Sequence, residues 1–225
     1  MKNLLKSLTI CAVLGAAINL NAQTVTVDPA TLTAGYMNWT PMPGDAAGYG
    51  GSGASAWGLS ALQANFAGST LTLAPNTNTY AAGNNYWVNA DGSGANKMDA
   101  NIYNETTGVY VGTTLTFTFD VLSNTLVSPY TSVGVIKDFA PDYSSFTEST
   151  VALTPGVDSV SLLTSANAGH HIQYGFETVG PDANPATVAA LGTVVIAPAA
   201  VPEPSTIALV AGGLLGALTI RRRKA

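Results

Sequence analysis

Apolar and polar side chains alternate strictly over residues 114–121, and this pattern limits the local fold more than any other feature of the chain. Leu115, Phe117, Phe119 and Val121 are separated by threonines and one aspartate. Successive side chains of an extended strand point to opposite faces, so the pattern places one face in a core and the other toward water or a second layer. The segment therefore predicts a strand of a two-sided β-sheet.

Other stretches of the chain show the same alternation over shorter lengths. They cover residues 69–75, 131–139, 159–163, 170–179 and 192–198. Clusters of Gly, Pro, Asn and Asp separate them, and before residue 205 only a weak helical turn is indicated, near 185–191. Many short strands without crossover helices predict an all-β ectodomain, an antiparallel β-sandwich that is jelly-roll-like and spans residues 23–200. The glycine-rich stretch 41–58 is expected to be a long surface loop packed on the sandwich through Tyr49 and Trp57.

The first 22 residues have the layout of a secretory signal peptide. Lys2 and Lys6 precede an apolar run over residues 8–18, and a polar stretch ends in Ala22, after which cleavage is expected. The apolar run is too short to favour a retained membrane helix. The secretion translocon and signal peptidase are therefore expected partners. The single cysteine, Cys11, lies in this segment, so the mature chain is expected to have no disulfide.

The charges of the predicted ectodomain are strongly acidic. Between residues 23 and 200, two lysines stand against twelve aspartates and glutamates, a net charge of −10. A surface of this sign repels phosphate backbones, which excludes nucleic acid as a partner. With 47% apolar residues in 225, the chain is nevertheless able to bury a sizeable core.

An apolar run over residues 205–220 follows, and a basic cluster of residues 221–225 closes the chain. The four cations of the cluster are Arg221, Arg222, Arg223 and Lys224. The run is somewhat shorter than the roughly 20 residues that span a bilayer comfortably. Because it is apolar all round, it favours a single transmembrane helix over a buried soluble helix. The basic cluster is then a cytoplasmic membrane stop, which places residues 23–200 on the outer side.

The short motif before this run carries a specific resemblance. Pro202 and Pro204 disfavour helix, so residues 201–204 are expected to be extended and accessible. Pro202, Glu203 and Pro204, the apolar run and the basic cluster together resemble the tripartite PEP-CTERM sorting signal, over Val201–Ala225. The resemblance implies recognition of the three motif residues by exosortase, a membrane-embedded cysteine transpeptidase. It implies transient anchoring in the inner membrane and then a cell-surface or extracellular location, and nothing about the ectodomain's fold.

Aromatic residues gather in the first half of the ectodomain and are candidates for glycan binding. They are Trp39, Trp57, Trp87 and Tyr86. Exposed rings stack on the apolar faces of sugars, while nearby amides bond to hydroxyls. The alternative is that these aromatic side chains fill the core or hold loops in place, because large rings are usually buried.

A second, weaker candidate is a calcium site in the glycine-rich stretch after residue 90. Asp91, Ser93, Asn96 and Asp99 offer oxygen ligands on an expected loop, although the spacing does not match an EF-hand. An ordinary solvated turn is the alternative. The two histidines, His170 and His171, are adjacent on a predicted strand, so their side chains should point to opposite faces and cannot share one metal.

No catalytic motif is recognisable in the sequence, and no catalytic residue is nominated. The ectodomain resembles, only generally, the noncatalytic β-sandwich modules of exported carbohydrate-handling bacterial proteins. The first hypothesis is a structural or adhesive noncatalytic surface or matrix protein, with or without polysaccharide contact. The second is a carbohydrate-binding module for extracellular polysaccharide. The third is a secreted glycoside hydrolase, which requires two carboxylates facing each other in a cleft.

Overall fold

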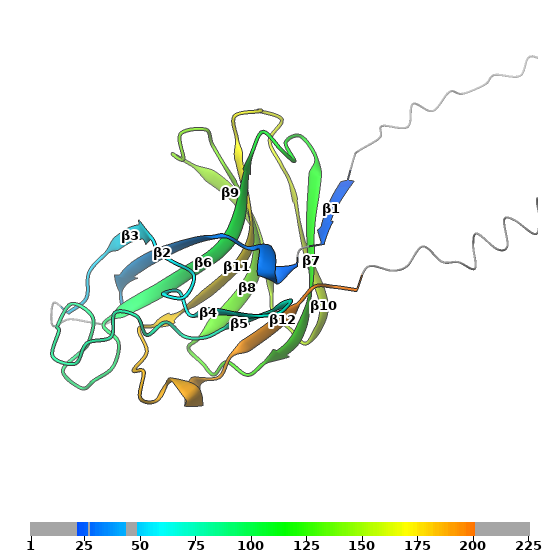
Figure 1. The fold of residues 1–225 in the computed structure, drawn as a ribbon. Helices are drawn as coiled ribbons and strands as arrows, with labels where there is room; N and C mark the ends of the chain where they lie inside the picture. Colours follow the sequence, from blue (N-terminus) through cyan, green and yellow to red (C-terminus); the bar gives the residue numbers. More distant parts are fainter. Residues whose placement is uncertain (1–21, 27, 44–48, 201–225) are drawn as a thin grey trace, which may run out of the picture.

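The computed structural model describes residues 22–26, 28–43 and 49–200, and this part of the chain is all-β (Figure 1). Its strands form two sheets that face each other, and its only helical elements are two 3₁₀ turns, η1 (Pro29–Thr31) and η2 (Val188–Leu191). The second of these falls in the segment for which a weak helical turn was expected. The predicted all-β, sandwich-like class is thereby confirmed.

The first sheet is built around a long central strand. Its strands are β1 (Ala22–Thr26), β4 (Ala64–Ala67), β5 (Thr70–Leu73), β7 (Thr114–Asn124), β10 (Gly156–Leu163) and β12 (Val194–Ala197). The order is β4-β5-β12-β7-β10. β1 pairs in parallel with the start of β7, while β12 pairs antiparallel with its end. The sheet is therefore mixed at one position and antiparallel elsewhere.

The second sheet is antiparallel throughout and supplies the broad face that matters below. Its strands are β2 (Ala34–Pro41), β3 (Gly53–Ala56), β6 (Asn96–Thr107), β8 (Thr131–Phe139), β9 (Phe146–Ala152) and β11 (His171–Pro181). The order is β3-β2-β6-β11-β8-β9. β11 lies near the middle and pairs over its length with β6 on one side and β8 on the other.

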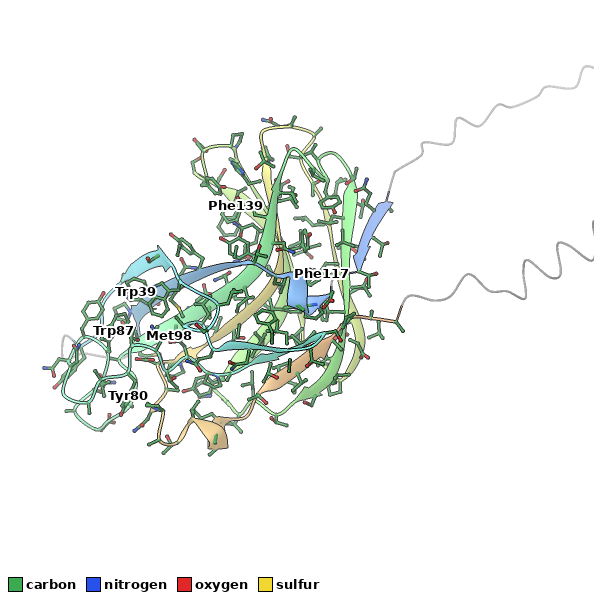
Figure 2. The ribbon with its side chains drawn as sticks, in the orientation of Figure 1. Trp39, Tyr80, Trp87, Met98, Phe117 and Phe139 are labelled. Atoms are coloured by element: carbon green, nitrogen blue, oxygen red, sulfur yellow. The ribbon has the colours of Figure 1, made fainter. Side chains whose placement is uncertain are left out.

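The core lies between the two sheets, and the alternating segment of β7 contributes its centre (Figure 2). Phe117 and Phe119 are fully buried, with ring centroids 5.3 Å and 4.9 Å from the buried ring of Phe176 on β11. The intervening threonines point away from this core. The strand predicted from alternation is thus confirmed, and it joins the sheets by aromatic packing.

Two local expectations need correction. The loop expected to carry Asp91 through Asp99 ends earlier, because β6 begins at Asn96 and places Asn96 and Asp99 on a strand. Asn and Asp have low strand propensity, so this end of β6 looks like a turn in the sequence. The stretch 41–58 is not a continuous loop either, because β3 forms within it and pairs with β2.

No helix in the described ranges 22–26, 28–43 and 49–200 is both long enough and apolar enough to cross a membrane. The predicted transmembrane helix over 205–220, the Pro-Glu-Pro motif and the basic cluster lie outside the described residues, as does the predicted signal peptide up to residue 21.

Candidate functional site

A groove of about 730 Å³ crosses the outer face of the second sheet. It reaches from Ala56 on β3 to Phe146 and Glu148 on β9, so all six strands of the sheet contribute to it. The side chains that line it are Tyr36, Asn38, Ala56, Asp99, Asn101, Tyr103, Glu105, Lys137, Phe139, Tyr143, Phe146, Glu148, Gln173 and Glu177. Alternate residues of each strand face the core, which leaves the intervening polar and aromatic residues for this face.

Strand register aligns these side chains in rows that run across the sheet. In one row, Gln173 on β11 lies opposite Glu105 on β6 and opposite Lys137 on β8, which in turn pairs with Glu148 on β9. In a second row, Asn101 lies between Tyr36 on β2 and Glu177 on β11. A molecule lying across the strands would therefore meet hydrogen-bonding groups from three or four strands in succession.

A buried polar network forms the floor of the groove. The Lys137 ammonium donates to Asn101 Oδ1 at 2.7 Å and to Glu177 Oε2 at 3.0 Å. Asn101 Nδ2 donates in turn to Asp99 Oδ1 at 2.8 Å. The side chains of Lys137 and Glu177 are only 11% and 18% exposed, so the ion pair is held inside the floor. Such a network fixes the positions of the polar groups around it.

Asp99 is the titratable group of this floor whose environment is most unusual. Burial, and secondarily the negative charge of Glu177, raises the pKa of Asp99 to about 6. The Lys137 charge and the amide donors of Asn38 and Asn101 oppose that rise. At neutral pH the carboxylate is therefore mainly ionised, and it takes up a proton in mildly acidic solution.

A second cluster is centred on Glu105 near the other end of β6. Its carboxylate accepts hydrogen bonds from Gln173 Nε2 at 2.6 Å and from the Tyr143 hydroxyl at 2.8 Å. Desolvation, followed by the hydrogen bond to Glu105, raises the pKa of Tyr143 to about 12. The Tyr143 ring is stacked on His171 at 4.3 Å between centroids. The loop between β8 and β9 is thus tied to the sheet beneath it.

Aromatic rings are exposed at both sides of the groove. Phe139 lies 4.9 Å from Phe146 and 5.6 Å from Tyr143, and the last two side chains are about half exposed. Tyr36, on the β2 side, is 37% exposed. Rings that keep this much exposed surface offer flat apolar contacts to a ligand, with polar groups of the floor between them.

The four aromatic residues predicted for glycan binding come together, but they do not line this groove. Trp39 lies 6.0 Å from Trp57 and 5.6 Å from Trp87, and its indole N–H donates to the Tyr86 hydroxyl at 2.9 Å. The three indoles are partly buried against the core, whereas Tyr86 is 39% exposed. In Figure 2, Trp39 and Trp87 lie apart from Phe139. Glycan binding by this tryptophan cluster stays a prediction.

The residues predicted to hold calcium are divided between separate structures. Asp91 Oδ1 accepts from the Ser93 backbone N–H and hydroxyl at 2.9 Å and 2.6 Å in an exposed turn. Asn96 is buried, where it donates to Tyr86 O and accepts from the Gly51 N–H, while Asp99 faces the groove. In the described part of the chain, no group of three or more His, Cys, Asp or Glu could hold a metal ion. A calcium site stays a prediction.

The two histidines point to opposite faces, as predicted. His170 Nδ1 lies 2.6 Å from Asp138 Oδ1 on the inner side of the sheet, and the Asp138 carboxylate is almost completely buried. His171 is stacked on Tyr143 at the edge of the groove. The two rings therefore contact different groups and share no partner.

Sequence reasoning nominated only Asp99 among the residues of the groove, and it did so for another role. A signal was present in β6, where Asp99, Asn101 and Tyr103 alternate with the buried apolar residues Met98, Ala100 and Ile102. This pattern identifies an outward face, but outward polar residues are the rule on half-buried strands. Only the pairing of β6 with β11 and β2 shows that these side chains join one groove.

The comparisons with known proteins concern the C-terminus. The model of the PEP-CTERM protein-sorting motif matches residues 200–224. Neither a curated protein nor a solved structure matches the chain. The match agrees with the resemblance seen at residues 201–225, and it implies an exosortase-type processing partner, export and membrane-associated sorting to the cell surface. The chain therefore carries a PEP-CTERM protein-sorting motif at its C-terminus, behind an all-β domain.

Proposed function

We propose that this protein is an exported, noncatalytic surface or matrix component whose ectodomain adheres by binding a polysaccharide chain across the second sheet. The observation that carries the proposal is the groove of about 730 Å³ lined by exposed rings and hydrogen-bonding side chains from six strands. The sorting motif at residues 200–224 supports delivery of the ectodomain to the cell surface.

The dimensions and chemistry of the groove suit an extended sugar chain. Six strands at a spacing of about 4.8 Å give a width of about 24 Å from edge to edge, enough for several sugar rings. The rings of Tyr36 and Phe146, on opposite sides, can pack on the apolar faces of pyranose rings. The side chains of Asn38 and Gln173 also line the groove and can form hydrogen bonds with sugar hydroxyls.

We also assign strands β5–β12 a jelly-roll topology. In the first sheet these strands run β5-β12-β7-β10, and in the second they run β6-β11-β8-β9. This order supports the assignment, because a chain wound as two Greek keys alternates between sheets in this manner. The winding places one face of each sheet in the core, and leaves the outer face of the second sheet open for a ligand.

The groove is tested by oligosaccharide binding to the full-length protein in a non-ionic detergent that has no sugar headgroup. We expect saturable binding of a neutral oligosaccharide, reduced about tenfold by Phe146→Ala, which corresponds to about 1.4 kcal/mol of lost contact. The matched control is Leu163→Ala, because Leu163 is 66% exposed on β10 of the other sheet. Equal loss in both variants, or no binding of any glycan, would contradict the proposal.

Glycoside hydrolysis is the second candidate, favoured by one observation. Asp99, with its raised pKa, lies close enough to Glu177 to feel its charge, and a protonated acid beside a carboxylate is the arrangement that glycosidases use. Both Asp99 oxygens already accept hydrogen bonds from amides, however, which favours a structural role. The same incubations should be assayed for new reducing ends; their appearance in the wild type and absence in Glu177→Gln would replace the noncatalytic proposal with a hydrolase.

For sorting, we propose that residues 205–220 span the membrane before processing and that Arg221–Lys224 stay in the cytoplasm. In a cell with an exosortase-type enzyme, Glu203→Ala should leave the full-length form in the membrane, because the motif is the recognised element. Glu148→Gln, outside the motif, should be processed like the wild type. Mass spectrometry of each form measures the outcome. If Glu203→Ala gave the same processed mass as the wild type, the role of the motif would be refuted.

A further inference from the structure

We propose that the groove selects a polysaccharide with free amino groups, such as a glucosamine polymer, and rejects polyuronates. This inference rests on the proposed function and names the chemical class of its ligand. Three observations support it: the excess of carboxylates in the lining of the groove, the ion pair that already occupies the Lys137 ammonium, and the spacing of the carboxylates along the sheet.

Four carboxylates and one ammonium line the groove. The carboxylates belong to Asp99, Glu105, Glu148 and Glu177, and the ammonium belongs to Lys137. The formal charge of the lining is therefore −3 when all five groups are ionised. A cationic chain gains from this field, and an anionic chain is repelled by it.

The single ammonium of the groove is already paired with a carboxylate and mostly buried. Its Nζ atom donates to Glu177 at 3.0 Å and to Asn101 at 2.7 Å, and the side chain is only 11% exposed. The Lys137–Glu177 pair carries no net charge, and a uronate that displaced Glu177 from this ammonium would leave that carboxylate buried without its partner, which is costly. No other Lys or Arg is among the described residues that line the groove.

The carboxylates are spread over the groove rather than gathered at one point. Asp99 and Glu105 are six residues apart on β6, which is about 20 Å along a strand. Glu105 and Glu148 belong to one row with two strands between them, which is about 14 Å across the sheet. A polymer with an amine on each ring can therefore meet several carboxylates at once, whereas a single cation cannot.

One of these carboxylates allows the charge to be changed without disturbing the floor. Glu148 is exposed on β9, and its side chain makes no hydrogen bond or ion pair in the described part of the chain. Glu148→Gln keeps the shape and removes one negative charge. It should therefore weaken binding of an amine-bearing chain more than binding of the acetylated chain.

The experiment is calorimetry of the full-length protein, in the same detergent, with three hexamers: glucosamine, N-acetylglucosamine and galacturonate. At neutral pH and low salt we expect the glucosamine hexamer to bind at least about tenfold more tightly than the acetylated one, and the galacturonate hexamer not to bind. The preference should shrink in about 0.5 M salt, where charges are screened within a few ångströms. Glu148→Gln should lower the preference severalfold, while Phe146→Ala should weaken both glucosamine-based hexamers.

The outcomes separate the inference from the function on which it rests. Equal affinity for the glucosamine and acetylated hexamers, or binding of galacturonate as tight as glucosamine, overturns the charge selection and leaves glycan binding in place. A lysine hexapeptide that binds as tightly as the glucosamine hexamer overturns it in favour of a basic peptide as the occupant. Absence of binding to every hexamer overturns the proposed function and the inference together.

Discussion

Replacing Asp182 by Asn should stabilise the protein, and the gain should depend on pH. Asp182 follows directly after β11 and is 1% exposed. Its Oδ2 atom accepts from the Thr79 hydroxyl at 2.9 Å, whereas its buried Oδ1 atom has no hydrogen-bond partner among the described residues. Burial raises the pKa of Asp182 to about 7. Ionisation of this side chain therefore costs free energy in the folded state.

The sign and size of the effect follow from the proton balance. An unfolded aspartate has a pKa of about 3.9, so between about pH 4 and pH 7 the folded state binds the proton that the unfolded state has lost. The stability that the protonated Asp182 side chain contributes is complete below about pH 4 and is lost as the pH rises toward the folded-state pKa of about 7. A difference of about 3 in pKa corresponds to about 4 kcal/mol in all, of which about 3 kcal/mol falls between pH 5 and pH 8.

Asp182→Asn keeps an oxygen for Thr79 and has no charge at any of these pH values. Its free energy of unfolding, relative to the wild type, should therefore increase by about 3 kcal/mol from pH 5 to pH 8. Urea unfolding followed by tryptophan fluorescence measures this, since the three indoles lie in one partly buried cluster.

The control for this experiment is Asp142→Asn. Asp142 is exposed, and hydrogen bonds from the Ser144 side chain and backbone lower its pKa, so it is ionised in both folded and unfolded states over this range. The stability difference between this variant and the wild type should not change from pH 5 to pH 8. If the free energy of unfolding of Asp182→Asn relative to the wild type were equally constant from pH 5 to pH 8, burial would not raise the pKa of Asp182 as argued.

Two further substitutions test the core and the floor of the groove. Phe117→Ala should lower the free energy of unfolding by about 3–5 kcal/mol, because it removes a fully buried ring that contacts both sheets. A loss below about 1 kcal/mol in urea unfolding would argue against this packing. Lys137→Met should lower the free energy of unfolding by about 3 kcal/mol or more, because it leaves Glu177 and Asn101 without their donor. The control Lys97→Met changes an exposed side chain of β6 and should alter stability by less than about 0.5 kcal/mol, so equal effects of the two variants in urea unfolding would count against the buried ion pair.

Several features of this protein are local, and the sequence determined them. The strand over residues 114–121 follows from alternation alone, because the direction of a side chain on a strand depends only on its position. The strands β5, β8, β10, β11 and β12 were predicted in the same way. The sorting motif is a contiguous run read by its order of residues, so no fold is needed to find it. The opposed directions of His170 and His171 are equally local.

Only the tertiary structure decided where the groove lies and what lines it. Lys137 and Glu177 are 40 residues apart in the chain, and they meet because β8 and β11 are neighbours in the sheet. The sequence shows each as one polar residue on the outer face of a strand, which is how most solvated positions look. The predicted tryptophans form a separate cluster, because the fold packs Trp39 and Trp87 against the core with their ring centroids only 5.6 Å from each other. Strand pairing over long distances depends on the burial of all strands together, so short-range patterns do not contain it.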